Sequence, residues 1–184
     1  MNRPTHYTSL LLLLIYLAGC SMNSHQPLKT VDQLDLQRFM GNWYVIANIP
    51  TFVEKGAVNA VENYALEDDG TIAVTFTYHK EDRSKPRKTM KSRGFVVPGT
   101  SNAQWKIQFF WPIKFPYYVI DLDEDYKYTV IGLPNRKYLW IMAREPYLDE
   151  EIYEGIIQRV REQGFDISKI QRVPQNWDDL QSQD

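Results

Sequence analysis

Few side chains in this chain have the types and spacing that nucleophilic catalysis or metal binding requires. The 184 residues include one cysteine and three histidines, and of these only His79 falls within a predicted strand. No sequence motif places a serine or cysteine nucleophile beside His79, and such catalysis needs both groups within hydrogen-bond reach. The Cys and His spacing typical of metal sites is also missing. The sequence therefore favours binding chemistry, with no cofactor or metal, over a lipid-modifying enzyme.

The single cysteine, Cys20, directly follows an apolar segment. Arg3 precedes nine apolar residues at 10–18, a run too short to span a bilayer and typical of a signal-peptide core. Leu17 to Cys20 resembles a bacterial lipobox, in which the cysteine thiol is acylated before cleavage. We expect a signal peptide over residues 1–19 and a lipidated Cys20 that opens a flexible tether over 20–33. An ordinary secretory signal followed by a free cysteine is the alternative.

The acyl chains expected on Cys20 would hold the protein on a membrane. Each buried methylene contributes about 0.8 kcal/mol, and more than one chain makes the attachment persistent. Ser21 stands where an aspartate would, in bacterial lipoproteins generally, favour retention in the inner membrane. The resemblance therefore implies a lipid anchor in the bacterial outer membrane.

Composition narrows the classes of ligand. The net charge of −2 and the pI near 5.9 give no overall basic field for a phosphate backbone, which argues against nucleic acid. Aromatic residues make up 14% of the chain, more than a small core requires. An apolar ligand is the simplest reason for this excess.

The elements that must position these side chains are mostly strands. Short β-like runs separated by turn signals predict an all-β sandwich or up-and-down barrel. The predicted strands are 41–49, 57–67, 71–79, 87–97, 103–111, 117–123, 127–133 and 138–145. A helix should follow, capped by Asp149, ended by Gly164 and packed through a stripe of Ile152, Tyr153, Ile156, Ile157 and Val160. We expect one domain over 34–176, with a short strand near 170–173 and a polar tail at 177–184.

One predicted hairpin fixes which side chains share a face. A three-residue loop, 68–70, with Gly70 in the left-handed conformation pairs Leu66 with Ile72, Tyr64 with Val74 and Glu62 with Phe76. A two-residue loop would mix apolar and polar faces, so we prefer the first register. Glu62 then lies on the apolar face, where an unpaired charge is costly. Either Glu62 contacts a ligand head group or the predicted register slips there.

Gly41 and Trp43 form a Gly-x-Trp motif, Tyr126 follows Asp125, and Arg144 lies in the last predicted strand. These three motifs, in this order, resemble the lipocalin family, specifically the bacterial outer-membrane lipoprotein lipocalins. Residues 36–40 resemble the family's short helical turn before the first motif. Asp125 and Tyr126 stand where the family often has Thr-Asp-Tyr, although Glu124 replaces the threonine. The last strand ends in Arg144. The resemblance implies an eight-stranded antiparallel up-and-down β-barrel with one C-terminal α-helix packed outside, and a structural contact of Arg144 across Trp43.

Such a barrel is wide enough for one small ligand. The register and the alternation of residues 104–111 place an apolar set inside, and either this set lines a ligand cavity, as the family resemblance favours, or it fills the core. The expected set is Tyr64, Leu66, Ile72, Val74, Phe76, Tyr78, Trp105, Ile107, Phe109, Trp111, Trp140 and Met142.

The predicted loops divide the charge along the barrel axis. The loops at the open mouth, 50–56, 80–88, 112–116 and 134–137, hold nine basic and three acidic residues, whereas the closed-end turns are mainly acidic. A cationic mouth would attract an anionic head group. Chance charges on solvated loops are the alternative. The expected mouth cations include Arg83, Lys85, Arg87, Lys88, Lys114 and Arg136.

The sequence thus predicts noncovalent binding of a fatty acid or lysophospholipid, for lipid storage or transport in outer-membrane maintenance or stress. An envelope interaction or scaffold lipoprotein, recruiting a partner through its outer face, is the alternative. The oligomeric state is left open, and a homodimer is compatible with the sequence.

Overall fold

The computed structural model describes residues 26–177. The expected signal peptide, Cys20, the first part of the tether and residues 178–184 lie outside the described residues. No helix of the described part is long and apolar enough to cross a bilayer.

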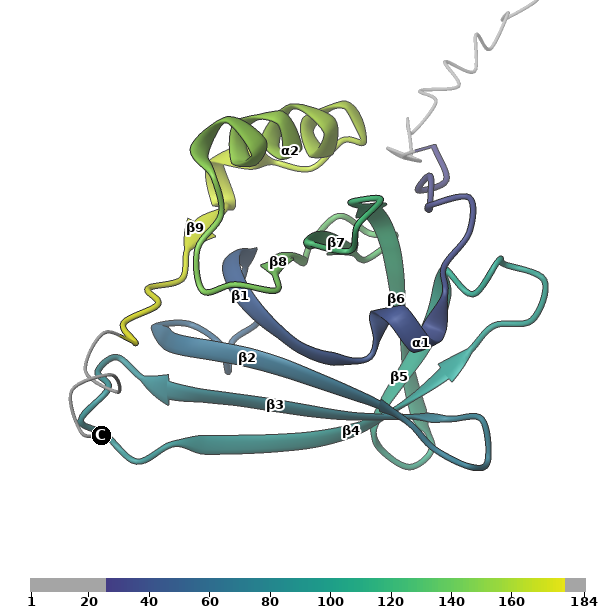
Figure 1. The fold of residues 1–184 in the computed structure, drawn as a ribbon, viewed down its shortest axis with the longest axis horizontal. Helices are drawn as coiled ribbons and strands as arrows, with labels where there is room; N and C mark the ends of the chain where they lie inside the picture. Colours follow the sequence, from purple (N-terminus) through teal and green to yellow (C-terminus); the bar gives the residue numbers. More distant parts are fainter. Residues whose placement is uncertain (1–25, 178–184) are drawn as a thin grey trace, which may run out of the picture.

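Eight antiparallel strands close into a barrel, which confirms the predicted fold class (Figure 1). Each strand pairs with the next along the chain, and β1 pairs with both β8 and β2 to complete the circle. The strands are β1 (Gly41–Ile49), β2 (Ala57–Leu66), β3 (Ile72–Lys80), β4 (Lys88–Val96), β5 (Gln104–Phe110), β6 (Ile113–Leu122), β7 (Tyr128–Gly132) and β8 (Leu139–Ala143).

The β2–β3 hairpin has the predicted register. Leu66 pairs with Ile72, Tyr64 with Val74 and Glu62 with Phe76. Gly70 has a φ of 77°, so the turn uses the left-handed conformation that glycine adopts without steric cost. Glu62 therefore lies inside the barrel.

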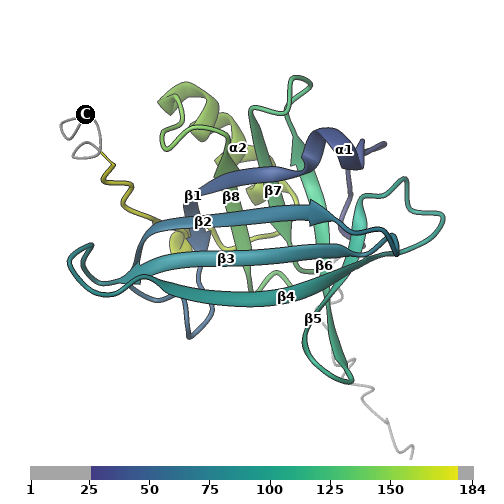
Figure 2. The ribbon, with the colours of Figure 1, turned by 60° about the horizontal axis from the view of Figure 1, so that its bottom comes forward.

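The β5–β6 hairpin differs from the prediction. β6 starts at Ile113, and only Trp111 and Pro112 separate it from β5. The expected mouth loop 112–116 is therefore wrong, and Lys114 and Phe115 are strand residues. Figure 2 shows this hairpin projecting from the barrel.

A short helix closes one end of the barrel. Helix α1 (Leu36–Phe39) is capped by Asp35, whose side chain accepts hydrogen bonds from the backbone of Gln37 and Arg38. It delivers Phe39 into the barrel, where its ring meets Trp43, Tyr64 and Trp105 at centroid distances of 5.1 to 5.4 Å. These four rings fill the closed end.

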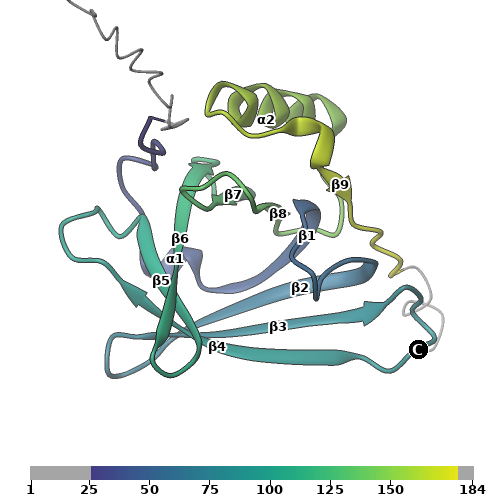
Figure 3. The same ribbon diagram turned by 180° about the vertical axis from the view of Figure 1, so that it is seen from behind.

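Helix α2 (Glu150–Glu162) packs on the outside, as predicted, over β7, β8 and β1 (Figure 1). Asp149 caps it, and Gly164 follows its end with a φ of 86°. The view from behind shows the barrel's width between this helix and β2 to β4 (Figure 3). Ile156 and Val160 are almost fully buried against the sheet, and each such side chain contributes roughly 1.5 to 3 kcal/mol.

One residue of the predicted helix stripe is misplaced. Ile152 is 41% exposed. Tyr153 takes the buried position in the first turn, with the Arg172 guanidinium 3.3 Å from its ring centre, and this leaves Ile152 toward solvent.

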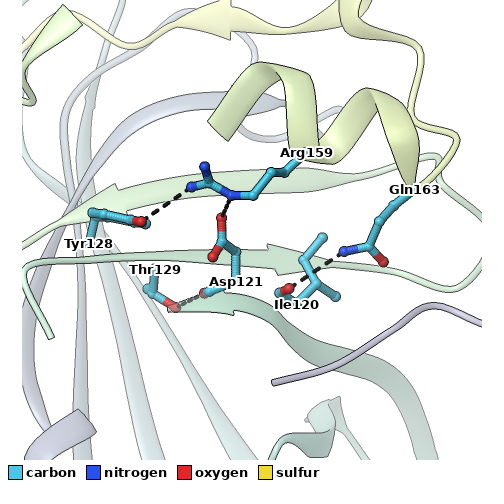
Figure 4. A network of polar contacts seen from close by, with 6 residues as sticks. All are labelled: Ile120, Asp121, Tyr128, Thr129, Arg159 and Gln163. Carbon is cyan, nitrogen blue, oxygen red and sulfur yellow. Dashed lines mark hydrogen bonds and ion pairs between the residues drawn. The ribbon is translucent and has the colours of Figure 1, made fainter. Parts of the chain in front are cut away.

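Polar contacts fix the helix to the wall (Figure 4). The Nε atom of Arg159 donates to Asp121 at 2.7 Å, and its Nη2 atom donates to the Tyr128 hydroxyl at 3.2 Å. Gln163 reaches the Ile120 carbonyl, and Thr129 donates to the carbonyl of Asp121. The helix therefore has one docked orientation.

The C-terminal segment completes the wall between β1 and β2. These strands pair only through residues 41–44 and 61–64. Beyond that point β1 pairs with β9 (Gln171–Arg172), the predicted short strand. Gln175 then donates to the carbonyls of both Val45 and Ala60, and Asn176 exchanges hydrogen bonds with Asn59. We call this junction the β1–β2 seam.

Candidate functional site

A cavity of about 510 Å³ lies inside the barrel above the aromatic closed end. This volume is within the range of about 300 to 1,000 Å³ that is usual for small-molecule sites. The lining comes from β2 to β6, from β8, and from the loops before β2 and before β8. It consists of Thr51, Val53, Glu54, Glu62, Val74, Phe76, Met90, Ser92, Ile107, Phe109, Phe110, Phe115, Pro116, Tyr117, Leu133, Tyr138 and Trp140.

Glu62 is the most unusual group of this lining. Its residue surface is only 7% exposed, and its Oε2 atom accepts hydrogen bonds from the hydroxyls of Tyr64 and Tyr117, the second at 2.8 Å. The two hydroxyls also lie 2.5 Å from each other. Burial raises the pKa of Glu62 from 4.5 to about 7, against the opposing effect of the two tyrosine hydrogen bonds. The carboxyl group is therefore close to half-protonated at neutral pH.

A second carboxylate, Glu54, lies at the mouth side of the cavity. It is also buried, and it accepts hydrogen bonds from the backbone N–H and hydroxyl of Thr51 and from the Trp140 indole at 2.6 Å. These three donors satisfy its charge. Glu54 thereby ties the β1–β2 loop to Trp140 on β8.

The predicted cavity residues divide into three groups. Val74, Phe76, Ile107, Phe109 and Trp140 line the cavity. The side chains outside the lining fill the core around it, with Leu66 only partly buried; these are Tyr64, Leu66, Ile72, Tyr78, Trp105 and Met142. Trp111 is 86% exposed, so its predicted inward position is wrong.

The cause of the Trp111 error is an irregularity in the hairpin. The pairing of β5 with β6 shifts between Ile107 and Phe110, which interrupts the inside–outside alternation. Phe109 stays in the lining but is half exposed.

The predicted mouth cations do not gather around the cavity. Arg136 is tied to three carbonyls, those of Pro134, Gln163 and Gln26. The Lys114 ammonium lies 3.3 Å from the ring centre of Phe95.

Three of the other four predicted cations lie in the β3–β4 connection, and Lys88 is the first residue of β4. Lys85 pairs with Glu81, Arg83 donates to the Asn176 carbonyl, and Arg87 donates to the Thr77 hydroxyl at 2.8 Å. Lys88 is opposite Tyr78 in the β3–β4 pairing, which places it on the inner face at the mouth. Among the described residues, the cavity lining contains two carboxylates and no lysine or arginine.

The remaining motif residues lie at the closed end. Trp43 donates to the Phe39 carbonyl, and the Arg144 guanidinium lies 3.8 Å from the Trp43 ring centre. Arg144 also donates to the carbonyls of Asn42 and Arg38. These contacts are structural and do not reach the cavity.

The second motif is also outside the cavity. The Tyr126 hydroxyl accepts from the Asp35 backbone, and the Arg38 guanidinium lies 4.1 Å from its ring centre. Asp125 is exposed and pairs with Lys127. Gly41 begins β1 with a φ of 96°.

Sequence reasoning missed two polar residues of the site. Tyr117 is the first residue of a predicted strand, but its hydroxyl donates to Glu62, which lies 55 positions earlier in the sequence. Glu54 was one of the three acidic residues counted in the mouth loops, and no local signal indicates its burial.

The comparisons with known proteins agree on one family. A family model described as a lipocalin-like domain matches residues 34–175. Temperature-induced lipocalin-1 of Arabidopsis thaliana is 34% identical over 170 residues, covering 84% of this chain and 87% of the relative. The outer membrane lipoprotein Blc of Escherichia coli K12 is 31% identical, covering 79% and 81%. The Vibrio cholerae Blc is 29% identical, covering 90% and 96%.

Solved structures show the same fold. Insecticyanin from the tobacco hornworm superposes with a TM-score of 0.66 at 17% identity, covering 83% of this chain and 87% of that one. The cockroach allergen Per a 4 gives 0.64 at 18% identity, covering 86% and 98%. Among the described residues, His79 is the one histidine; its Nδ1–H donates to the Lys85 carbonyl at 2.7 Å, and it does not line the cavity.

Proposed function

The chain belongs to the lipocalin family, and from this premise we propose that it binds a fatty acid or a lysophospholipid noncovalently, with the acyl chain inside the barrel. The apolar cavity carries this proposal, because its volume and lining suit one hydrocarbon chain. The protein acts as a carrier or store of lipid and not as an enzyme.

The two buried carboxylates orient the ligand. A fatty-acid carboxylate placed beside Glu62 would bring two like charges together in an apolar environment, which is strongly unfavourable. The head group therefore stays at the mouth, and the hydrocarbon end points toward Glu62. Lys88 is the predicted mouth cation whose strand position suits an anionic head group there.

The path of the N-terminal segment supports attachment to a membrane at the mouth. Arg136, in the mouth loop between β7 and β8, holds the carbonyl of Gln26. Cys20 stands six residues before Gln26 in the sequence. Six residues of fully extended chain span at most about 20 Å. A lipidated Cys20 would thus keep the mouth close to the bilayer.

The mouth also carries apolar side chains suited to a lipid surface. Phe52 and Trp111 are each 86% exposed, and Phe110 is 58% exposed. Exposed apolar side chains at one end of a barrel are typical of an interaction surface. We assign it to the membrane that supplies the ligand, and the similarity to outer membrane lipoproteins supports the bacterial outer membrane as that membrane.

A tryptophan-fluorescence titration tests the proposal, because Trp140 lines the cavity. All the contacts described lie within residues 26–177, so a chain beginning at Ser21 keeps them. We expect saturable one-to-one binding of hexadecanoic acid and of a lysophospholipid below their micellar concentrations. No response to either ligand would refute lipid binding and favour an envelope scaffold.

The head-group assignment has its own matched pair of variants. Lys88→Ser should weaken binding of the anionic lipid in low salt, since it removes a charge from the inner face at the mouth. Lys91→Ser on the same strand is the control, because Lys91 lies opposite Thr75 on the outer face. Equal affinities of the two variants would remove Lys88 from the proposed site.

A further inference from the structure

One oxygen of Glu62 has no role in the contacts described so far. Its Oε2 atom takes both tyrosine hydrogen bonds, and no described residue donates to its Oε1 atom. In the described part of the chain, every fully enclosed side-chain nitrogen or oxygen has a partner. The unpartnered Oε1 atom is therefore open to the cavity that Glu62 lines.

No other described residue donates a hydrogen bond to the Glu62 side chain. Tyr64 on the same strand and Tyr117 on β6 are already committed to Oε2. Glu54, the other charged group that acts on it, is an acceptor itself. Phe76 stands opposite on β3 and is apolar. The missing hydrogen-bond donor must therefore come from whatever occupies the cavity.

We propose that Glu62 is an acceptor subsite on the cavity floor for a hydroxyl group at the inner end of the ligand. This inference rests on the proposed function, since it concerns the end of the acyl chain remote from the head group. The ligand class is a long-chain amphiphile that carries a hydroxyl at or near its hydrocarbon terminus. A plain methyl end would leave the buried Oε1 atom without a partner.

Other polar ends fit the floor less well. A carboxylate would be repelled by Glu62 and by Glu54. An ammonium group would have to lose its hydration in an apolar cavity, a cost that attraction to one carboxylate often does not recover. A hydroxyl can donate to the ionised carboxylate and also to the protonated carboxyl group, which keeps acceptor capacity, and the pKa of Glu62 near 7 means that both forms are present at neutral pH.

The test compares three sixteen-carbon acids on the chain beginning at Ser21. Hexadecanoic acid ends in a methyl group, 16-hydroxyhexadecanoic acid in a donor, and 16-methoxyhexadecanoic acid in an ether that only accepts. We expect the hydroxy acid to bind about tenfold more tightly than the other two, equivalent to about 1.4 kcal/mol. Equal affinities for the hydroxy and methoxy acids would overturn the inference, and this comparison needs no variant.

Variants then locate the effect. Glu62→Leu removes the proposed acceptor, so the preference for the hydroxy acid over hexadecanoic acid should be lost. Ser92→Ala, which removes a different hydroxyl from the same lining, should keep the preference for the hydroxy acid. An unchanged preference in Glu62→Leu would assign the hydroxyl to another group. Failure of all three acids to bind the unmodified chain would refute the proposed function itself.

Discussion

Replacing Glu62 by glutamine should change the pH dependence of stability. Glutamine has nearly the shape of the protonated carboxyl group and can accept the same bonds from Tyr64 and Tyr117. It cannot ionise. The substitution therefore removes the titration of the Glu62 carboxyl group and leaves the packing of the cavity floor unchanged.

The magnitude follows from the two pKa values of Glu62. The unfolded chain titrates near 4.5 and the folded protein at about 7, so between these values the native state holds a proton that the unfolded state has lost. Stability then falls as the pH rises through this window, and it is constant above it. About 2.5 pKa units at 1.36 kcal/mol each amount to a loss of about 3 kcal/mol.

Urea unfolding followed by tryptophan fluorescence measures this loss. The free energies of unfolding of the native chain and of Glu62→Gln should nearly agree at pH 4, below both pKa values, and the variant should be about 3 kcal/mol more stable at pH 8. All other titrating groups are common to both proteins, so their contributions cancel in the difference.

Glu67→Gln on the exposed β2–β3 turn is the matched control and should show no gain at either pH. A Glu62→Gln protein whose advantage is the same at both pH values would refute the assignment of a buried, proton-binding carboxyl group.

Three further predictions concern the fold. Trp43→Ala and Arg144→Ala should each lower the melting temperature by several degrees, since the two side chains stack at 3.8 Å; unchanged melting of both would end their structural assignment. Gly132→Ala should destabilise by roughly 1 to 3 kcal/mol in urea unfolding, because an added Cβ would lie 2.7 Å from Phe165, and a neutral result would contradict that packing. Asp149→Ala should cost about 1 kcal/mol of stability by the same measurement, through loss of the α2 cap; no loss would exclude the cap as a stabilising contact.

The strand framework was predictable because its signals are local. Gly70 and the alternation around it fixed the β2–β3 register, and with it the inward position of Glu62. Asp149 and Gly164 likewise mark the ends of α2 within a few residues of the contacts they make. Turn chemistry and periodicity act over short stretches of chain, which a single sequence displays directly.

The polar site was not predictable to the same extent. Arg136 was assigned to the ligand from its loop alone, yet its partners Gln163 and Gln26 are 27 and 110 positions away. Glu54 accepts a hydrogen bond from Trp140, which is 86 positions away in the sequence. Trp111 was misplaced because the alternation was extended through an irregular hairpin. A count of charges in each loop omits these long-range partners. It gives the backbone position of a cation and not the position of its charged side-chain end.

The β1–β2 seam also determines the order in which the barrel wall can be completed. Gln175 bridges Val45 and Ala60, and it follows Ala60 by 115 positions. During synthesis the strands of the wall emerge long before the residue that joins their far halves. A nascent chain that has reached residue 170 contains all eight strands and still has an unsealed wall. The mouth half of the barrel is therefore completed only after residues 171–176 have been synthesised.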